Sequence, residues 1–161
     1  DTTKHISVLH INANCTIAFD EVEKFVPVSK GRECLPGELI FSKINPRIPR
    51  MAVIPKRDTR LVCSNEVEIM RSKSVIGMHA LCFLLSTESV IKQIENLSAG
   101  TSSSHSRIKR EQLEDILVPI PSNSEAQRTI EEIDQRLEKS VRQIYLSEEE
   151  LFRSATVLNN I

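Results

Sequence analysis

Basic side chains gather in two loop-like stretches of this 161-residue sequence. In residues 43–50, prolines break helical structure and stiffen the chain around the cations. Residues 100–110 begin with glycine, threonine and serine and end with further cations. Lysine and arginine neutralise phosphates, and arginine and asparagine also read base edges in the major groove. We therefore predict a nucleic-acid-binding surface. Its candidate contact residues are Lys43, Asn45, Arg47, Arg50, Ser103, His105, Arg107 and Lys109.

The aromatic content indicates which nucleic acid such a surface would bind. Aromatic residues make up 4% of the chain, with no Trp and one Tyr. Proteins that bind single strands stack the bases on aromatic side chains, and this chain has too few for such a platform. The net charge is −1, but basic residues crowd the first half and acidic residues lie later, which would orient the molecule toward a polyanion. The predicted target is therefore duplex DNA.

Catalytic motifs are not found in the sequence. The four histidines are scattered, and no H-E-x-x-H pair, Walker loop or G-x-G-x-x-G occurs. His105 lies among serines, as a base beside a nucleophile would, but no G-x-S-x-G frames them. We favour a hydrogen-bonding loop at this place. The D-P-P-Y and N-P-P-[FY] motifs of adenine methyltransferases are also absent. We predict a non-catalytic protein without a cofactor or a metal site.

The cysteines and the lengths of the apolar runs indicate the cellular compartment in which the protein folds. Cys15, Cys34, Cys63 and Cys82 lie far apart in the sequence, without a C-x-x-C. This spacing favours reduced, partly buried thiols over a zinc site. No apolar run approaches the roughly 18 residues that a membrane span needs, and the first residues have no signal-peptide organisation. We therefore expect a cytoplasmic protein.

Hydrophobic patterning predicts an α+β fold, with a small mixed or antiparallel β domain, short helices and one long helix. The expected strands are 5–11, 15–19, 22–28, 38–44, 51–54, 61–63 and 67–70. From about residue 77 the spacing becomes helical and predicts two short helices, the second capped by Ser86 or Thr87. A short buried segment, 116–120, follows. The long helix, over about 125–159, begins at a capping box formed by Ser124 and Gln127.

The long helix carries an aliphatic residue at every seventh position. The series is Ile130, Leu137, Ile144, Leu151 and Leu158. A strict seven-residue repeat predicts a left-handed coiled coil with a partner helix. The alternative is an amphipathic helix packed on its own domain. At ~50 Å by helix rise, the helix outreaches so small a core, which favours a partner, and the charge distribution favours an antiparallel pair.

Two stretches of the sequence match motifs of a known family. Residues 36–47 read P-G-E-L-I-F-S-K-I-N-P-R. The later pieces are Gly100-Thr101, Arg107-Ile108, Val118-Pro119-Ile120-Pro121, and Gln127 with Ile130. This order resembles the specificity subunit of type I restriction–modification enzymes, which has P-G-D-[IL]-L-[FL]-S-[RK]-I-N-P-R, then a G-[ST]-rich loop, I-P-[IL]-P and E-Q-x-x-I. Ala126 stands where that family usually has Glu.

The resemblance implies a target-recognition domain, residues 1–121, that lacks its N-terminal part, followed by a coiled-coil spacer or dimerisation helix, residues 122–161. In that family two recognition domains each read half of a split DNA site, and two antiparallel helices hold them apart and dock methyltransferase subunits. The implied partners are double-stranded DNA, methyltransferase and restriction subunits, and a second helix from a homodimer or from the same longer chain.

Two alternatives remain open at this point. The first is the recognition domain of a single-chain restriction–methylation enzyme, which ranks behind the specificity subunit. A coiled-coil assembly adaptor that does not bind DNA is the other reading.

Overall fold

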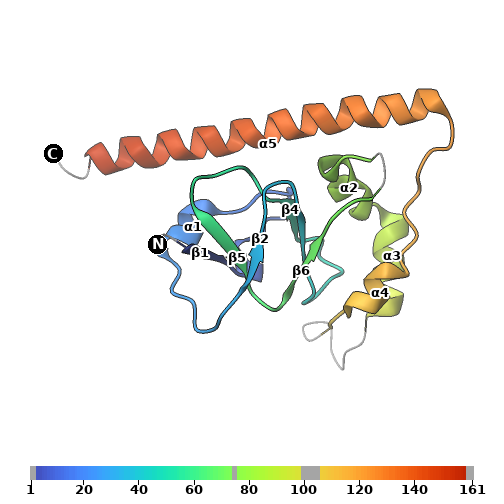
Figure 1. The fold of residues 1–161 in the computed structure, drawn as a ribbon, viewed down its shortest axis with the longest axis horizontal. Helices are drawn as coiled ribbons and strands as arrows, with labels where there is room; N and C mark the ends of the chain where they lie inside the picture. The colour runs from blue at the N-terminus through green and yellow to red at the C-terminus, as the bar shows by residue number, and fades with distance from the viewer. Residues whose placement is uncertain (1–2, 74–75, 99–105, 159–161) are drawn as a thin grey trace.

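Two three-stranded sheets form the centre of the computed structural model, which describes residues 3–73, 76–98 and 106–158 (Figure 1). The first sheet has the order β1-β5-β2, with β1 parallel and β2 antiparallel to β5. The second has the order β4-β3-β6 and is antiparallel throughout. The strands are β1 (Thr3–Ile6), β2 (Arg32–Cys34), β3 (Leu39–Ser42), β4 (Met51–Val53), β5 (Arg60–Cys63) and β6 (Val67–Met70).

Short helices surround the sheets, and one long helix runs along one side of them (Figure 1). The helices are η1 (Val8–His10), α1 (Phe19–Lys24), α2 (Met78–Leu85), α3 (Glu88–Leu97), α4 (Arg110–Glu114) and α5 (Ser124–Leu158). The 35 residues of α5 span ~52 Å at 1.5 Å per residue. Its C-terminal end reaches past the rest of the molecule (Figure 1). Of the helices in the described ranges, none is long and apolar enough to cross a membrane.

Strand β3 separates two hydrophobic clusters because successive side chains of a strand point to opposite faces. Ile40 lies in a cluster with the first sheet and α1, to which α5 contributes Val141 and Tyr145. Leu39 and Phe41 lie in a second cluster with α2 and α3. All four residues of β3 are buried. The middle of α5 is therefore part of the domain's core.

The α+β class and the long C-terminal helix are confirmed, and several predicted strands lie within or beside observed ones. The strand expected at 22–28 is wrong. Helix α1 covers its first three residues, because Phe19 and Val22 are both buried at helical spacing with acidic residues between them. The stretch 15–19 forms only one bridge, between Ile17 and Ile11. Neither β2 nor α4 was predicted.

Two further expectations around the start of α5 need correction. Asn123, not Ser124, caps the helix, because its side-chain oxygen accepts a hydrogen bond from the Ala126 N–H at 2.7 Å. Residues 116–120 form no strand or helix, and Leu117 and Ile120 are exposed. Gln93 of α3 fixes this segment through two hydrogen bonds of 2.9 Å with the backbone of Leu117. The expected burial therefore holds in part: Ile116 and Val118 pack against the second cluster, whereas Leu117 and Ile120 do not.

All four cysteines are buried and free, as expected from their apolar surroundings. Their thiols contact in two pairs. The sulfurs of Cys34 and Cys63 lie 3.1 Å apart in adjacent strands, and Cys15 contacts Cys82. The hydrogen bond to the partner thiol, together with burial, raises the pKa of Cys63 and of Cys82.

Gly77 lets α5 approach the N-terminus of α2. The Asp134 carboxylate accepts a hydrogen bond from the Ala80 N–H at 2.7 Å, which satisfies one of the unpaired donors of that helix end. A Cβ on Gly77 would overlap this carboxylate. The contact therefore fixes α5 against α2.

Replacing Gly77 by alanine is expected to lower the free energy of unfolding by about 1–3 kcal/mol, because Asp134 must move away. The same substitution should cost much less in an Asp134→Ala background, as chemical denaturation of the four proteins would show. Gly37→Ala is the control, since Gly37 has a φ of +85° and open space around it. Its cost should not depend on Asp134. Equal costs of Gly77→Ala in both backgrounds would contradict the explanation.

Candidate nucleic-acid interface

Backbone hydrogen bonds join the two basic stretches predicted from the sequence. Ile44 and Arg107 form an antiparallel bridge. The Asn45 N–H donates to the Ser106 carbonyl at 2.9 Å, and the Ile108 N–H donates to the Lys43 carbonyl at 3.1 Å. The stretch 43–50 and the residues 106–110 are far apart in the sequence and lie side by side in the structure. We call these two segments together the paired loops.

A tight turn presents Arg47 at the tip of the first loop. The Ile48 N–H donates to the Asn45 carbonyl at 2.9 Å, which places Pro46 and Arg47 at the two central positions. Proline is favoured at the first of these positions because its φ is already set. Asn45 itself has a φ of +47°, a conformation that asparagine tolerates better than most residues. Local sequence therefore builds a stiff turn with an exposed Arg47.

The amide oxygen of Asn45 is buried and has no hydrogen-bond partner among the described residues. A bidentate contact with adenine needs both amide atoms at the surface. In this conformation Asn45 joins the paired loops through its backbone. The predicted contact of its side chain with DNA stays a prediction.

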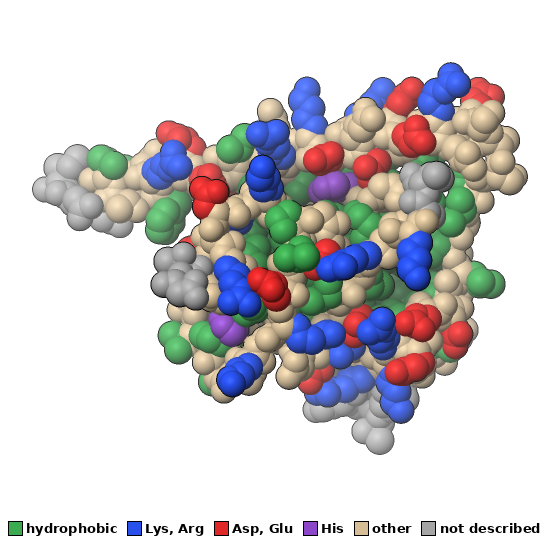
Figure 2. Space-filling view, in the orientation of Figure 1, with side chains coloured by type: hydrophobic (Ala, Val, Ile, Leu, Met, Phe, Trp, Pro, Cys, Tyr) green, Lys and Arg blue, Asp and Glu red, His purple; other side chains and the backbone are tan. Residues whose placement is uncertain are grey.

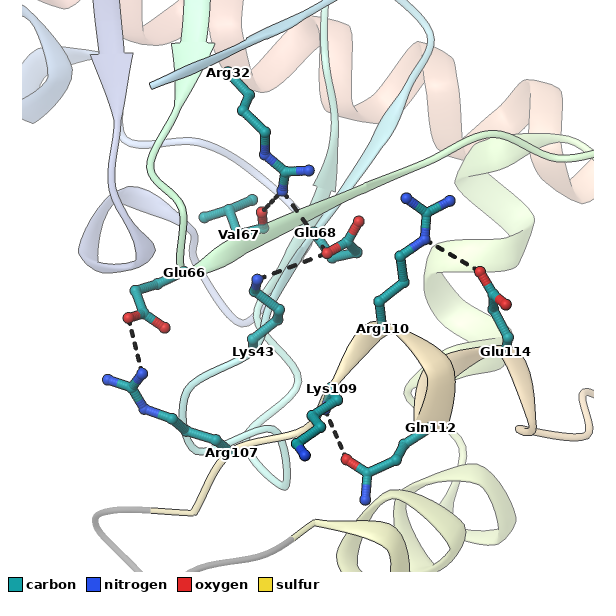
Figure 3. Close-up of polar contacts among 10 residues, drawn as sticks. All are labelled: Arg32, Lys43, Glu66, Val67, Glu68, Arg107, Lys109, Arg110, Gln112 and Glu114. Atoms are coloured by element: carbon teal, nitrogen blue, oxygen red, sulfur yellow. Dashed lines mark hydrogen bonds and ion pairs between the residues drawn. The ribbon is translucent and has the colours of Figure 1, made fainter. Parts of the chain in front are cut away.

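Carboxylates on and beside β6 hold several of the cations (Figure 3). Glu68 is buried and lies 3.7 Å from both Arg32 and Lys43. Arg32 also donates to the Val67 carbonyl at 2.7 Å. Arg107 forms a 3.0 Å ion pair with Glu66. Arg32 is not among the contact residues expected from the sequence, because only the position of β2 near β6 brings it close to Glu68 and Lys43.

The remaining predicted contacts differ in their surroundings. Arg47 and Lys109 are exposed and Arg50 is partly buried, and none of the three has an ion pair with another described residue. Lys109 precedes α4, where its N–H donates to the Gln112 side chain at 2.7 Å. Ser103 and His105 lie outside the described residues. On the face drawn in Figure 2, many Lys and Arg side chains lie over the sheets and short helices, with Asp and Glu side chains among them.

The predicted helix-interface residues turn gradually away from the domain along α5. Ile130 and Leu137 are partly buried against it. Ile144 is 36% exposed, Leu151 71% and Leu158 70%. A seven-residue series drifts by about 20° per repeat on a straight helix, whereas Val141 and Tyr145 stay on the domain-facing side. The series therefore leaves an apolar flank open along the C-terminal half of α5.

A hollow of the described surface lies between α1, residues 56–59 and the C-terminal half of α5, and no residue of the paired loops lines it. Arg57 stacks on the Phe19 ring at 4.0 Å and pairs with Glu149 at 3.2 Å. Burial, with Asp20 nearby, raises the pKa of Glu148. No group of three metal-ligating side chains lies together in the described part of the chain.

Solved structures with the same fold come from type I restriction–modification (R-M) systems. One is a chain from a structure that describes the complex assembly and conformational transition of the type I R-M system. Its TM-score to this chain is 0.63 and its sequence identity is 16%. Another is the HsdS subunit from Thermoanaerobacter tengcongensis, with a TM-score of 0.59 and 17% identity. Each match covers 96% of this chain and 40% of the other. At the level of the fold, the resemblance expected from the sequence is confirmed.

Sequence comparison adds nothing to the structural likeness. No protein-family model matches the sequence, and no curated protein matches it.

Proposed function

We propose that this chain recognises a specific sequence in duplex DNA and directs separate methyltransferase and restriction subunits to it, as the recognition part of a type I R-M specificity subunit. The observation that carries the proposal is the pairing of the two basic loops, which brings Lys43, Arg47, Arg107 and Lys109 to one surface. The shared fold supports the same assignment. The chain spans 40% of the length of each similar structure, so the partners belong to the proposal.

The paired loops have the properties that reading a duplex requires. Exposed arginines such as Arg47 can contact phosphates or the guanine edge. The backbone bonds between the loops and the Pro46 turn hold such side chains in a defined position, which lowers the ordering cost of binding. Among the described residues, the exposed side chains of the paired loops lie on an open surface, whereas a base-modifying enzyme needs a closed pocket. These features favour recognition without chemistry on the DNA.

A titration with labelled duplex DNA at increasing salt tests this function. We expect binding whose log affinity falls with log salt by about 0.9 per neutralised phosphate. A single strand of the same length should bind more weakly, because the protein lacks an aromatic platform. Absence of salt-dependent duplex binding would contradict the proposal and leave the non-DNA adaptor.

We also propose that α5 pairs with an antiparallel second helix through its open flank. The apolar residues of this flank are Ile133, Ile144, Leu151 and Leu158. Exposed apolar surface of this extent normally marks an interface. An antiparallel pair would place two recognition domains at opposite ends, as a split DNA site requires. In a longer chain the second helix would come from the same polypeptide.

Replacing Ile144 and Leu151 by aspartate is expected to dissociate the paired chains, so that the measured mass falls to that of a monomer. The domain should stay folded, because both residues lie off the side of α5 that packs on it. Light scattering measures the mass, and circular dichroism checks the helix. Leu146→Asp with Val157→Asp is the matched control, since both are exposed on another side of α5. A wild type that stays monomeric at high concentration would contradict pairing between copies.

A further inference from the structure

The acidic residues at the paired loops fall into two kinds (Figure 3). The Glu68 side chain is 6% exposed and lies between Arg32 and Lys43. The Glu66 side chain is 37% exposed and pairs with Arg107, which is 61% exposed. A buried carboxylate between two cations is a fixed counter-ion. An exposed pair is weak and exchanges readily with other ions.

The Glu66–Arg107 side-chain pair does not hold the loops together. The Lys43 N–H donates to the Glu66 carbonyl at 2.9 Å, and the bridge between Ile44 and Arg107 and the bond from Asn45 to Ser106 are also backbone contacts. These bonds remain when the Glu66 carboxylate is changed. The pair therefore calls for an explanation other than loop structure.

We propose that Glu66 is a specificity-determining residue that competes with DNA for Arg107. The inference rests on the proposed function of the paired loops. In the free protein the carboxylate occupies the guanidinium. A phosphate or a guanine edge must displace it before Arg107 can contact DNA.

The competition acts unequally on different DNA sequences. Once displaced, Glu66 stays near Arg107, where it repels a charged phosphate bound to Arg107 more strongly than the uncharged edge of a guanine. Arginine binds phosphate and guanine in a bidentate manner, so a sequence with guanine at this place meets less repulsion than one where Arg107 reaches only a phosphate. A built-in repulsive element of this kind suppresses binding to the many wrong sequences more than to the right one.

The test compares wild type, Glu66→Gln, Arg107→Gln and the double variant with a random-sequence duplex pool. We expect Glu66→Gln to bind the pool about 5-fold more tightly at low salt, the upper range for an exposed ion pair. Its gain should largely disappear in the Arg107→Gln background. Sequencing of the bound duplexes should show a weaker sequence preference for Glu66→Gln than for wild type.

Glu33→Gln is the matched control. Glu33 pairs with Arg60 at 2.8 Å between β2 and β5, and it points to the other face of β2 from Arg32. The substitution Glu33→Gln removes the same charge outside the paired loops. The affinity of this variant for the duplex pool should therefore stay near that of wild type.

Three results would overturn the inference. Glu66→Gln could bind the pool no more tightly than Glu33→Gln. The gain could persist in the Arg107→Gln background, which would make it an effect of net charge alone. The sequence preference could be unchanged. If neither wild type nor Glu66→Gln binds duplex DNA at all, the proposed function fails and this inference fails with it.

Discussion

Replacing Tyr145 by alanine is expected to lower the free energy of unfolding by about 3–5 kcal/mol, the range for a large buried aromatic residue. Tyr145 is 7% exposed in the first cluster. Its ring meets the edge of Phe19 at a centroid distance of 5.2 Å. Its hydroxyl oxygen accepts a hydrogen bond from the Ile17 N–H at 3.0 Å, and burial raises its pKa. This side chain is thus the main anchor between α5 and the N-terminal part of the domain.

Tyr145→Phe separates the hydrogen bond from the packing. It keeps the ring and leaves the buried Ile17 N–H without its acceptor, so we expect a cost of about 1–3 kcal/mol. Leu146→Ala is the control, because Leu146 is the next residue of α5 and is 55% exposed. It should change stability by less than about 0.5 kcal/mol. Urea denaturation measures all three variants, and a Tyr145→Ala cost as small as that of Leu146→Ala would contradict the shared core.

Removal of Arg47 and Arg107 together is expected to weaken duplex binding strongly. Removing an arginine that reads a base should cost about 1–3 kcal/mol of binding free energy. Removing one that contacts only phosphate should reduce the slope of log affinity against log salt by about 1. The double variant Arg47→Ala, Arg107→Ala therefore carries the largest expected loss of affinity from two substitutions.

The control for this variant is Arg128→Ala with Arg136→Ala, which removes two exposed cations from α5. Fluorescence anisotropy with one labelled duplex, at several salt concentrations, compares the two pairs. Equal losses for both pairs would mean that charge alone, and not the paired loops, drives binding. An unchanged affinity of the first pair would mean that DNA binds elsewhere.

The two basic loops can be predicted from the sequence, but their backbone pairing in the structure cannot. Proline and glycine placement marks 43–50 and 100–110 as loops by local chemistry alone. The bond from Asn45 to Ser106 joins residues with no local relation. The roles of Glu66 and Glu68 depend on where β6 lies beside β3. One of these carboxylates is buried and the other exposed, and nothing in the stretch around them distinguishes the two.

The long helix shows a similar division between local pattern and packing. Its length follows from the seven-residue series, which local sequence displays openly. Its contact with the domain uses Asp134, Val141 and Tyr145, and none of these belongs to that series. The domain surface that they meet is assembled from strands and helices far away in the sequence. Packing of α5 on its own domain therefore coexists with an open apolar flank, and the predicted coiled coil stays a prediction.

The most direct test of the central claim is a nuclear magnetic resonance titration of the chain with duplex DNA. The account predicts that backbone amide shifts concentrate in residues 43–50 and 106–110, with smaller changes at Glu66 and Arg32. Val141 and Tyr145 of α5 should not shift, because both are buried in the core. Shifts confined to α5, or the absence of shifts at both loops under conditions where the duplex binds, would contradict the claim that the paired loops read DNA.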